Sequence, residues 1–255
     1  MFVFIIPFRS QYTTDNWSQA CAFLQRTLTS ICNQTDQDFK VLVVCSEIPD
    51  GVIKNPKIDF IRSTLPIPNS FQEKCKDSKI KTRIGIFYAQ YLNPSFVMSV
   101  DADDLVSNRL VEYTKKNFKG QGLFFDKGYL YVEGENKVFL KRKDFYKWCG
   151  TCNIFRFGIF DIPESTEFNY FSEEVMANTY CLHHSTAPKL LMEKGMSMEP
   201  LPFPGAIYSI DNGINVSSAS KKKLAVNNPL RLIKRVLVNY RFLTHSIRDE
   251  FGIWN

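Results

Sequence analysis

The chain has 255 residues, of which 44% are hydrophobic and 23% are charged, a balance typical of a globular protein with a full core. This composition excludes a disordered or fibrous chain. The 32 lysines and arginines exceed the 26 aspartates and glutamates, which gives a formal net charge of +6. This charge suits phosphate-bearing partners or an anionic membrane surface without requiring either.

The sequence has no pattern typical of a secreted or membrane-spanning protein. The apolar start, residues 1–8, is shorter than a signal-peptide core, and no later stretch reaches the roughly 18 apolar residues of a membrane helix. The seven cysteines, an odd number, are scattered through apolar segments, as is typical of buried thiols in a reducing compartment. We therefore expect a cytoplasmic protein.

Strand and helix patterns alternate over the first hundred residues. Apolar runs of strand length occupy residues 2–6, 40–44, 58–61 and 96–100. Helical spacing predicts a helix over residues 17–31, with Asp15 or Asn16 as its cap, and another over residues 80–91. The order predicts a doubly wound, mostly parallel α/β sheet. Such sheets bind ligands at the carboxyl ends of their strands, here the first, second and fourth.

The pattern changes beyond residue 108. Residues 108–117 predict a short helix, and residues 120–142 alternate like hairpin strands rich in aromatic residues. Residues 229–243 predict an amphipathic helix with leucines on one side and arginines on the other. We expect one compact domain followed by a basic helical appendage, residues 219–255. This helix either docks on its own domain or contacts an anionic membrane surface as a peripheral attachment.

The sharpest motif is SVDADD, residues 99–104, at the end of the fourth predicted strand. In an extended chain Asp101 and Asp103 project to the same side, so we expect both carboxylates at the ligand-binding edge of the sheet. Carboxylates this close repel one another unless a cation compensates them, and a hard divalent ion with positions open for substrate phosphates would do so. The alternative is that these aspartates cap the helix that begins near Asn108.

Taken in order, these segments resemble the GT-A glycosyltransferases of the broad family-2-like group, which use nucleotide-diphosphate sugars. The matching pieces are FIIPFR (residues 4–9), VLVVCSE (41–47), KIKTRIG (79–85) and the aspartate motif. LPFPGAIY (201–208) and NGINVS (212–217) are similar to the closing segment of bacterial members. The resemblance extends to about residue 218, and it depends on the order and spacing of the pieces.

The resemblance implies a GT-A fold over residues 1–218, with a nucleotide-sugar-binding half (1–107) and a mixed acceptor-side half (108–218). The implied nucleotide-sugar-binding residues are Pro7, Arg9, Glu47, Lys81, Arg83, Asp101 and Ala102, and Asp103 together with Asp101 would hold Mn²⁺ or Mg²⁺. Positive charge from Lys81 and Arg83 would stabilise a departing nucleoside diphosphate. The alternative for these two cations is a solvated helix face.

The acceptor side is less defined. Inverting members of such a family need a carboxylate base, for which Glu173 and Glu174 are the candidates and Asp126 a further one. The alternative for the glutamates is a favourable helix N-terminus capped by Ser172. His184 is the candidate third metal ligand, as a C-terminal histidine serves some GT-A enzymes, or else a histidine packed near the surface.

Three further features leave alternatives open. Asp211-Asn212-Gly213 stands where many relatives have a histidine beside the late glycine, which leaves the third metal ligand open. The CGTC segment, residues 149–152, superficially resembles a redox pair, but a strand pattern follows it, so a turn entering a strand is the better interpretation. The aromatic residues Phe124, Phe125, Tyr129 and Tyr131 either stack on sugars or belong to the core.

The leading hypothesis is a metal-dependent glycosyltransferase that moves a sugar from a nucleotide-diphosphate sugar to a glycan or lipid-linked hydroxyl, by resemblance in cell-surface polysaccharide synthesis. The alternatives are a sugar nucleotidyltransferase and a non-catalytic sugar- or nucleotide-binding relative. No glycine-rich phosphate loop follows the first strand, which argues against the nucleotidyltransferase. Nucleic acid is not an expected partner, because acidic residues balance the basic ones outside the tail.

Overall fold

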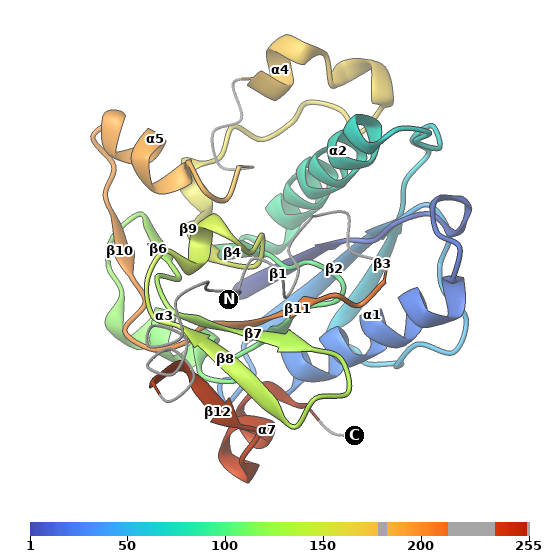
Figure 1. The fold of residues 1–255 in the computed structure, drawn as a ribbon. Helices are drawn as coiled ribbons and strands as arrows, with labels where there is room; N and C mark the ends of the chain where they lie inside the picture. Colours follow the sequence, from blue (N-terminus) through green and yellow to red (C-terminus); the bar gives the residue numbers. More distant parts are fainter. Residues whose placement is uncertain (178–182, 214–237, 254–255) are drawn as a thin grey trace.

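The computed structural model describes residues 1–177, 183–213 and 238–253. Within these residues the chain folds into two mixed β-sheets and six α-helices (Figure 1). The first sheet has seven strands in the order β10-β6-β9-β4-β1-β2-β3, and the second has five in the order β12-β8-β7-β11-β5. This mixed α/β architecture confirms the predicted fold class.

The centre of the first sheet is parallel. Its strands are β1 (Phe2–Pro7), β2 (Phe39–Cys45), β3 (Ile58–Arg62) and β4 (Phe96–Ser99), and β1 pairs in parallel with both β2 and β4. Beyond β4 lie β9 (Asn153–Arg156), β6 (Gly122–Phe124) and β10 (Met198–Pro200). Strand β9 runs antiparallel to both β4 and β6. All four strands expected in the first hundred residues are therefore confirmed.

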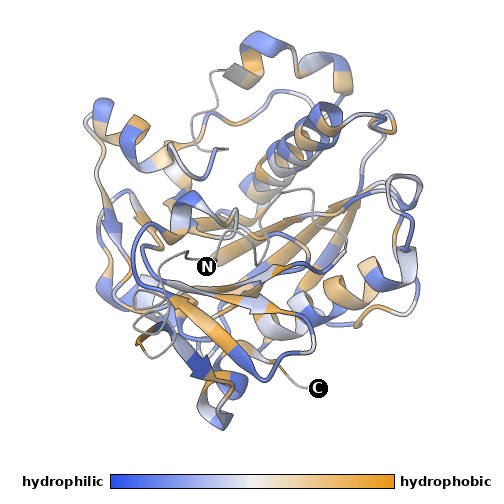
Figure 2. Cartoon of the chain, viewed as in Figure 1, coloured by the Kyte–Doolittle hydropathy of each residue, from blue (hydrophilic) through white to orange (hydrophobic). Residues whose placement is uncertain are grey.

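Strand β1 is buried on both faces because helices cover both sides of the sheet. Phe2, Phe4 and Ile6 pack with the apolar side of α1 (Trp17–Cys32), whereas Val3 and Ile5 pack with α2 (Phe71–Ala89). Figure 2 shows the strands as mostly apolar and the helices as mixed, as this layering requires. Adjacent residues of one strand thus bury against different helices.

The two helices begin at strong sequence caps. Asn16 accepts the backbone N–H of Gln19 and caps α1, as expected. Helix α2 begins well before the predicted start at residue 80, because Ser70 and Glu73 form a reciprocal capping box. These extra turns bring several polar side chains of α2 to the carboxyl ends of the strands.

The second sheet forms from the later part of the chain. Its strands are β5 (Leu105–Val106), β7 (Gly128–Val132), β8 (Lys137–Lys141), β11 (Ala206–Ile210) and β12 (Tyr240–Phe242). Strands β7 and β8 form the expected hairpin, but β6 is not part of it, because β6 pairs with β9 and β10 in the first sheet. The helix expected over residues 108–117 is α3 (Leu110–Asn117).

The aromatic residues of this region mostly belong to the core. Phe125 and Tyr131 are completely or almost completely buried. Tyr129 packs edge-on against Phe251, and Phe124 packs edge-on against Tyr146. The core interpretation therefore holds for Phe125 and Tyr131, which have no surface to offer a sugar.

The C-terminal segment differs from its predicted form where the structure describes it. Residues 240–242 form β12, which pairs with β8 antiparallel, so the end of the amphipathic helix expected over residues 229–243 is a strand. The part of that expected helix before residue 238 lies outside the described residues. Helix α7 (His245–Phe251) follows with Thr244 as its cap. None of the described helices has the length and apolar character needed to cross a membrane.

Candidate functional site

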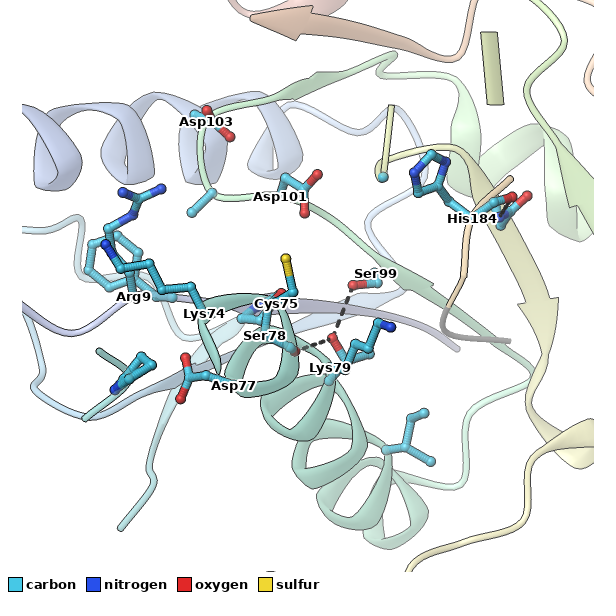
Figure 3. A pocket seen from close by; sticks show the side chains of 18 of the residues that line it. Arg9, Lys74, Cys75, Asp77, Ser78, Lys79, Ser99, Asp101, Asp103 and His184 are labelled. Carbon is cyan, nitrogen blue, oxygen red and sulfur yellow. Dashed lines mark hydrogen bonds between the residues drawn. The ribbon is translucent and has the colours of Figure 1, made fainter. Parts of the chain in front are cut away.

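A cavity of about 340 Å³ lies at the carboxyl ends of β1 and β4, beside the N-terminal half of α2 (Figure 3). The first strand and its loop supply Pro7, Phe8 and Arg9, and the end of β4 supplies Ser99, Asp101, Ala102 and Asp103. Helix α2 supplies Lys74, Cys75, Asp77, Ser78, Lys79 and Thr82. Trp148, Gly150, Asn153 and His184 close the remaining side. The site thus lies where the sheet topology predicts it.

A turn, rather than an extended chain, carries Asp101 and Asp103 into this cavity. The backbone N–H of Asp104 donates to the carbonyl of Asp101 at 3.1 Å, which reverses the chain between them. Asn212 donates through Nδ2 to Asp103 Oδ2 at 2.7 Å, and the N–H of Asp101 donates to Thr151 Oγ1 at 2.9 Å. Both aspartates are therefore fixed at the cavity wall, although the alternation argument for their direction was wrong.

The third aspartate has a structural position. Asp104 is fully buried, and its carboxylate accepts the backbone N–H of Ser209 and the thiol of Cys149, both at 3.2 Å. Helix α3 has Arg109 at its N-cap and no side-chain cap. The alternative interpretation of the aspartates as helix caps is therefore wrong.

Two neighbouring carboxylates, those of Asp101 and Asp103, are buried at the cavity wall. Burial and the neighbouring Asp103 raise the pKa of Asp101 to about 7, and burial also raises the pKa of Asp103. The guanidinium of Arg9 lowers both pKa values, and burial in turn lowers the pKa of Arg9. Two neighbouring carboxylates that are buried and repel each other suit Mn²⁺ or Mg²⁺, whose remaining positions substrate phosphates would fill. The residues present thus fit a divalent cation.

His184 lines the cavity but does not complete a ligand cluster. Within the described ranges no group of three His, Cys, Asp or Glu side chains is arranged to hold a metal ion. The structure therefore does not bring Asp101, Asp103 and His184 together as one ligand group. The residue beside the late glycine, Asn212, hydrogen-bonds Asp103 instead.

Lys81 and Arg83 do not face the cavity. Lys81 is fully buried, pairs with Asp77 at 2.8 Å and donates to the carbonyl of Phe8 at 2.9 Å. Arg83 is also buried and donates to the carbonyl of Asp161 at 2.7 Å. These contacts are internal to the protein. Lys81 and Arg83 therefore neither face the cavity, as expected for phosphate binding, nor lie on a solvated helix face, which was the alternative.

Two other lysines of α2 line the cavity in their place. Lys74 donates to the carbonyl of Thr13 at 3.1 Å, next to the loop that follows β1, and Lys79 lies on the side nearer Ser99 (Figure 3). Neither lysine was among the site residues predicted from the sequence. The capping box at Ser70 and Glu73 is the signal that would have extended the helix to include Lys74.

Glu47 holds the β1 loop rather than lining the cavity. Its two carboxylate oxygens accept Ser10 Oγ at 3.0 Å and the backbone N–H of Gln11 at 3.1 Å. Pro7 and Arg9, at the start of that loop, do line the cavity, as does Ala102. Of the implied nucleotide-sugar-binding residues, Glu47 is thus a third, after Lys81 and Arg83, that does not line the cavity.

The three candidate bases lie outside the cavity. Glu173 and Glu174 are exposed at the start of α4 (Glu173–Ala177), where Ser172 Oγ accepts the N–H of Val175 at 3.3 Å. The helix-start interpretation describes this geometry. Asp126, in the turn after β6, accepts the N–H of Asp144 at its Oδ1 at 2.7 Å, and it does not line the cavity either.

The CGTC segment is a turn with two buried thiols that leads into β9. Cys149 and Cys152 are free thiols and fully buried, and residue 153 begins β9, which confirms a turn entering a strand. Burial raises the thiol pKa of both cysteines well above its usual value, which keeps them protonated. A redox role is disfavoured because such thiols are poor nucleophiles.

Comparisons with known proteins give likeness in fold only. No family model and no curated protein matches the sequence. Solved structures with a similar fold include TarS of S. aureus, with 13% identity, a TM-score of 0.43, and coverage of 93% of this chain but only 43% of TarS. This chain therefore spans less than half of the TarS chain.

Two other solved structures represent different reactions. The inositol-1-phosphate CTP transferase of T. maritima has 10% identity, a TM-score of 0.44, and coverage of 93% of this chain and 96% of that one. The galactosyltransferase LgtC, in complex with donor and acceptor sugar analogues, has 14% identity, a TM-score of 0.41, and coverage of 78% and 73%. These likenesses concern the fold, and they assign no reaction to this chain.

Proposed function

We propose that this protein is a metal-dependent glycosyltransferase that moves a sugar from a nucleotide-diphosphate sugar to a hydroxyl of a glycan or glycolipid, in cell-surface polysaccharide synthesis. The observation that carries the proposal is the cavity in which Asp101, Asp103 and Arg9 meet at the carboxyl ends of β1 and β4. The cavity thus combines carboxylate oxygens that can bind a divalent cation with a guanidinium that can bind phosphate.

The cavity residues divide into two groups by chemistry. Arg9, Lys74 and Lys79 supply positive charge, which offsets the charge of a diphosphate and stabilises it as a leaving group. Asp101 and Asp103 would hold Mn²⁺ or Mg²⁺, which when bound supplies further positive charge at the diphosphate. Asn212 keeps the Asp103 carboxylate in one orientation.

The loop after β1 favours a glycosyltransferase over a sugar nucleotidyltransferase. The first glycine of the sequence is Gly51, so residues 8–16 offer no glycine-rich cradle for a triphosphate. The loop is instead fastened by Ser10 and Gln11 to Glu47. A nucleotidyltransferase would bind CTP or UTP more tightly than the corresponding diphosphate.

Calorimetric titration tests the proposal. We expect one of UDP, GDP, CDP and dTDP to bind with Mn²⁺ and not with EDTA, and CTP and UTP to bind no more tightly than the diphosphates. Asp103→Asn should abolish the metal-dependent binding while the protein stays folded. The matched control is Asp59→Asn on β3, where the carboxylate is half-exposed and pairs with Lys40.

Each result has a separate meaning. Binding of no nucleotide to the wild-type protein rules out the proposed function. Undiminished metal-dependent binding by Asp103→Asn rules out the assigned cation site. Binding without release of diphosphate from any sugar donor would identify a non-catalytic relative.

A further inference from the structure

His184 lines the cavity, and one of its two ring nitrogens is hydrogen-bonded to the protein backbone. The ring Nδ1 is hydrogen-bonded to the backbone carbonyl of Tyr146. Because a carbonyl can only accept, Nδ1 must carry the proton of this bond. In a neutral imidazole the lone pair then lies on Nε2, for which the described residues provide no hydrogen-bond partner. Burial lowers the pKa of His184, which favours that neutral form.

The ring is held in one place from several directions. Asn153, itself buried, donates through Nδ2 to the backbone carbonyl of His184 at 3.1 Å. The His183 ring stacks on it, with the ring centres 5.6 Å apart and the planes 13° apart. In Figure 3 the ring extends from its backbone toward the part of the cavity in front of Asp101. A fixed lone pair at a cavity wall meets the positional requirement for a general base.

The carboxylates that line the cavity have other roles. Asp77 pairs with Lys81, and Asp101 and Asp103 are the donors for the proposed cation. The sequence-derived candidates Glu173, Glu174 and Asp126 do not line the cavity. Among the cavity residues that the structure describes, His184 is therefore the remaining side chain, other than the Cys75 thiol, with a group suited to general-base catalysis.

We propose that His184 is the catalytic base, which takes the proton of the acceptor hydroxyl on Nε2. As the O–H bond breaks, the hydroxyl oxygen forms a bond to the anomeric carbon of the donor sugar. The bond from that carbon to the diphosphate oxygen breaks, and its electron pair leaves with the nucleoside diphosphate. The imidazolium then releases its proton to solvent. This role rests on the proposed function, and the single displacement inverts the anomeric configuration.

The neighbouring Trp148 indicates the class of acceptor. It lines the cavity together with His184, and the Lys141 ammonium lies 4.8 Å from the centre of its ring. An indole offers a large apolar surface with a fixed orientation, which suits the apolar face of a sugar ring. We therefore assign this end of the cavity to a carbohydrate acceptor.

The first test is nitrogen NMR on protein labelled in its three histidines. His184 should show a proton on Nδ1 and an unprotonated Nε2 at neutral pH, with assignment by His184→Gln. A protonated Nε2 in the neutral ring overturns the proposal, because that nitrogen could not then accept a proton. This readout does not depend on knowing the donor or the acceptor.

The second test separates catalysis from donor binding. Release of nucleoside diphosphate is measured from UDP-glucose, UDP-N-acetylglucosamine, GDP-mannose and dTDP-glucose, with water or methyl glycosides as acceptors. We expect His184→Gln to lower the turnover about 10²–10⁴-fold, with metal-dependent nucleotide affinity changed less than about threefold. The glutamine amide can replace the hydrogen bond to Tyr146 but cannot take up a proton. His245→Gln, at the exposed start of α7, is the matched control.

The outcomes distinguish this inference from the proposed function. Turnover of His184→Gln within threefold of wild type, with nucleotide binding intact, overturns the base assignment and leaves the function standing. Loss of turnover in Glu173→Gln or Glu174→Gln, with His184→Gln unaffected, returns the role to the sequence-derived candidates. A wild-type protein that binds no nucleotide, or binds one and releases no diphosphate from any donor, contradicts the catalytic role together with the function.

Discussion

A Cβ atom at Gly150 would lie 2.5 Å from Asp101 Oδ2. The two residues belong to neighbouring strands, because Gly150 precedes β9 and Asp101 follows β4, which pairs with β9. Thr151 Oγ1 and the thiol of Cys149 hydrogen-bond the same aspartate segment, at Asp101 and Asp104. The CGTC turn therefore acts as the support on which the aspartates rest, and this role accounts for its small residues.

Gly150→Ala should displace the Asp101 carboxylate, because no ordinary contact brings a Cβ so close to an oxygen. We expect metal-dependent nucleotide affinity to fall about 10–100-fold, the cost typical of disturbing a support of a metal ligand. Titration calorimetry with Mn²⁺ and the nucleotide that binds wild type measures it. Gly158→Ala, where nothing lies within 4 Å of the new Cβ, is the control and should bind normally. Equal affinities for the two variants would show that Asp101 needs no such support.

Asn212→Ala should weaken the same binding by a different route. The variant removes the Nδ2 donor that lies 2.7 Å from Asp103 Oδ2, so the carboxylate loses the hydrogen bond that orients it. We expect affinity for the Mn²⁺–nucleotide complex to fall about tenfold, with the melting temperature nearly unchanged. Asn117→Ala, an exposed amide on α3, serves as the control. An unchanged affinity for the Mn²⁺–nucleotide complex would mean that Asp103 does not need the hydrogen bond from Asn212 to be correctly oriented.

Lys81 and Lys79 on α2 should have opposite phenotypes. Lys81→Met leaves the buried Asp77 carboxylate without its cation, so we expect the free energy of unfolding to fall by about 3–5 kcal/mol. Lys79→Met removes a cavity lysine and should weaken nucleotide binding with little loss of stability. Urea denaturation and calorimetry on both variants measure the two effects.

A compensating variant keeps this comparison interpretable. In the Lys81→Met background, Asp77→Asn removes the uncompensated charge and should restore part of the lost stability. If Lys81→Met instead retains wild-type stability and loses nucleotide affinity, the phosphate-binding role implied by the family resemblance is correct for Lys81.

The sequence pattern predicted the parts of the site that depend on strand ends. Asp101 and Asp103 follow a buried strand of the parallel sheet, and the topology of such sheets brings their position to the ligand-binding edge. Pro7 ends β1 and Arg9 follows it, so the same topology brings both to this edge. These predictions needed only the order of the elements.

The parts that failed depend on how side chains pack around a helix. Lys81 carries a charge, which favours solvent, yet Asp77 lies one helical turn before it and allows burial of the pair. The spacing of Asp77 and Lys81 is visible in the sequence. Whether such a pair is exposed or buried depends on how α2 packs on the sheet, which the sequence pattern does not show. The sequence could not show which group holds the His184 ring, because Tyr146, whose carbonyl contacts it, is 38 residues away in the chain.

Packing of α2 against β1, which positions the cavity lysines, can be tested at Gly85. A Cβ there would lie 2.4 Å from Ile5 Cγ2, so Gly85→Ala should lower the free energy of unfolding by about 1–3 kcal/mol despite the better helix propensity of alanine. Ile5→Ala alone should cost about 2–5 kcal/mol through the cavity it leaves. In the double variant the new methyl group fills part of that cavity.

We therefore expect the double variant to be more stable than the sum of the single effects by about 0.5–3 kcal/mol, measured by urea denaturation. The sign of this coupling follows from the geometry, because each change removes the strain or the void that the other creates. Additivity within about 0.5 kcal/mol would mean that α2 and β1 separate slightly to admit the methyl group. In that case metal-dependent nucleotide binding by Gly85→Ala would fall as well, since Lys74 and Lys79 move with the helix.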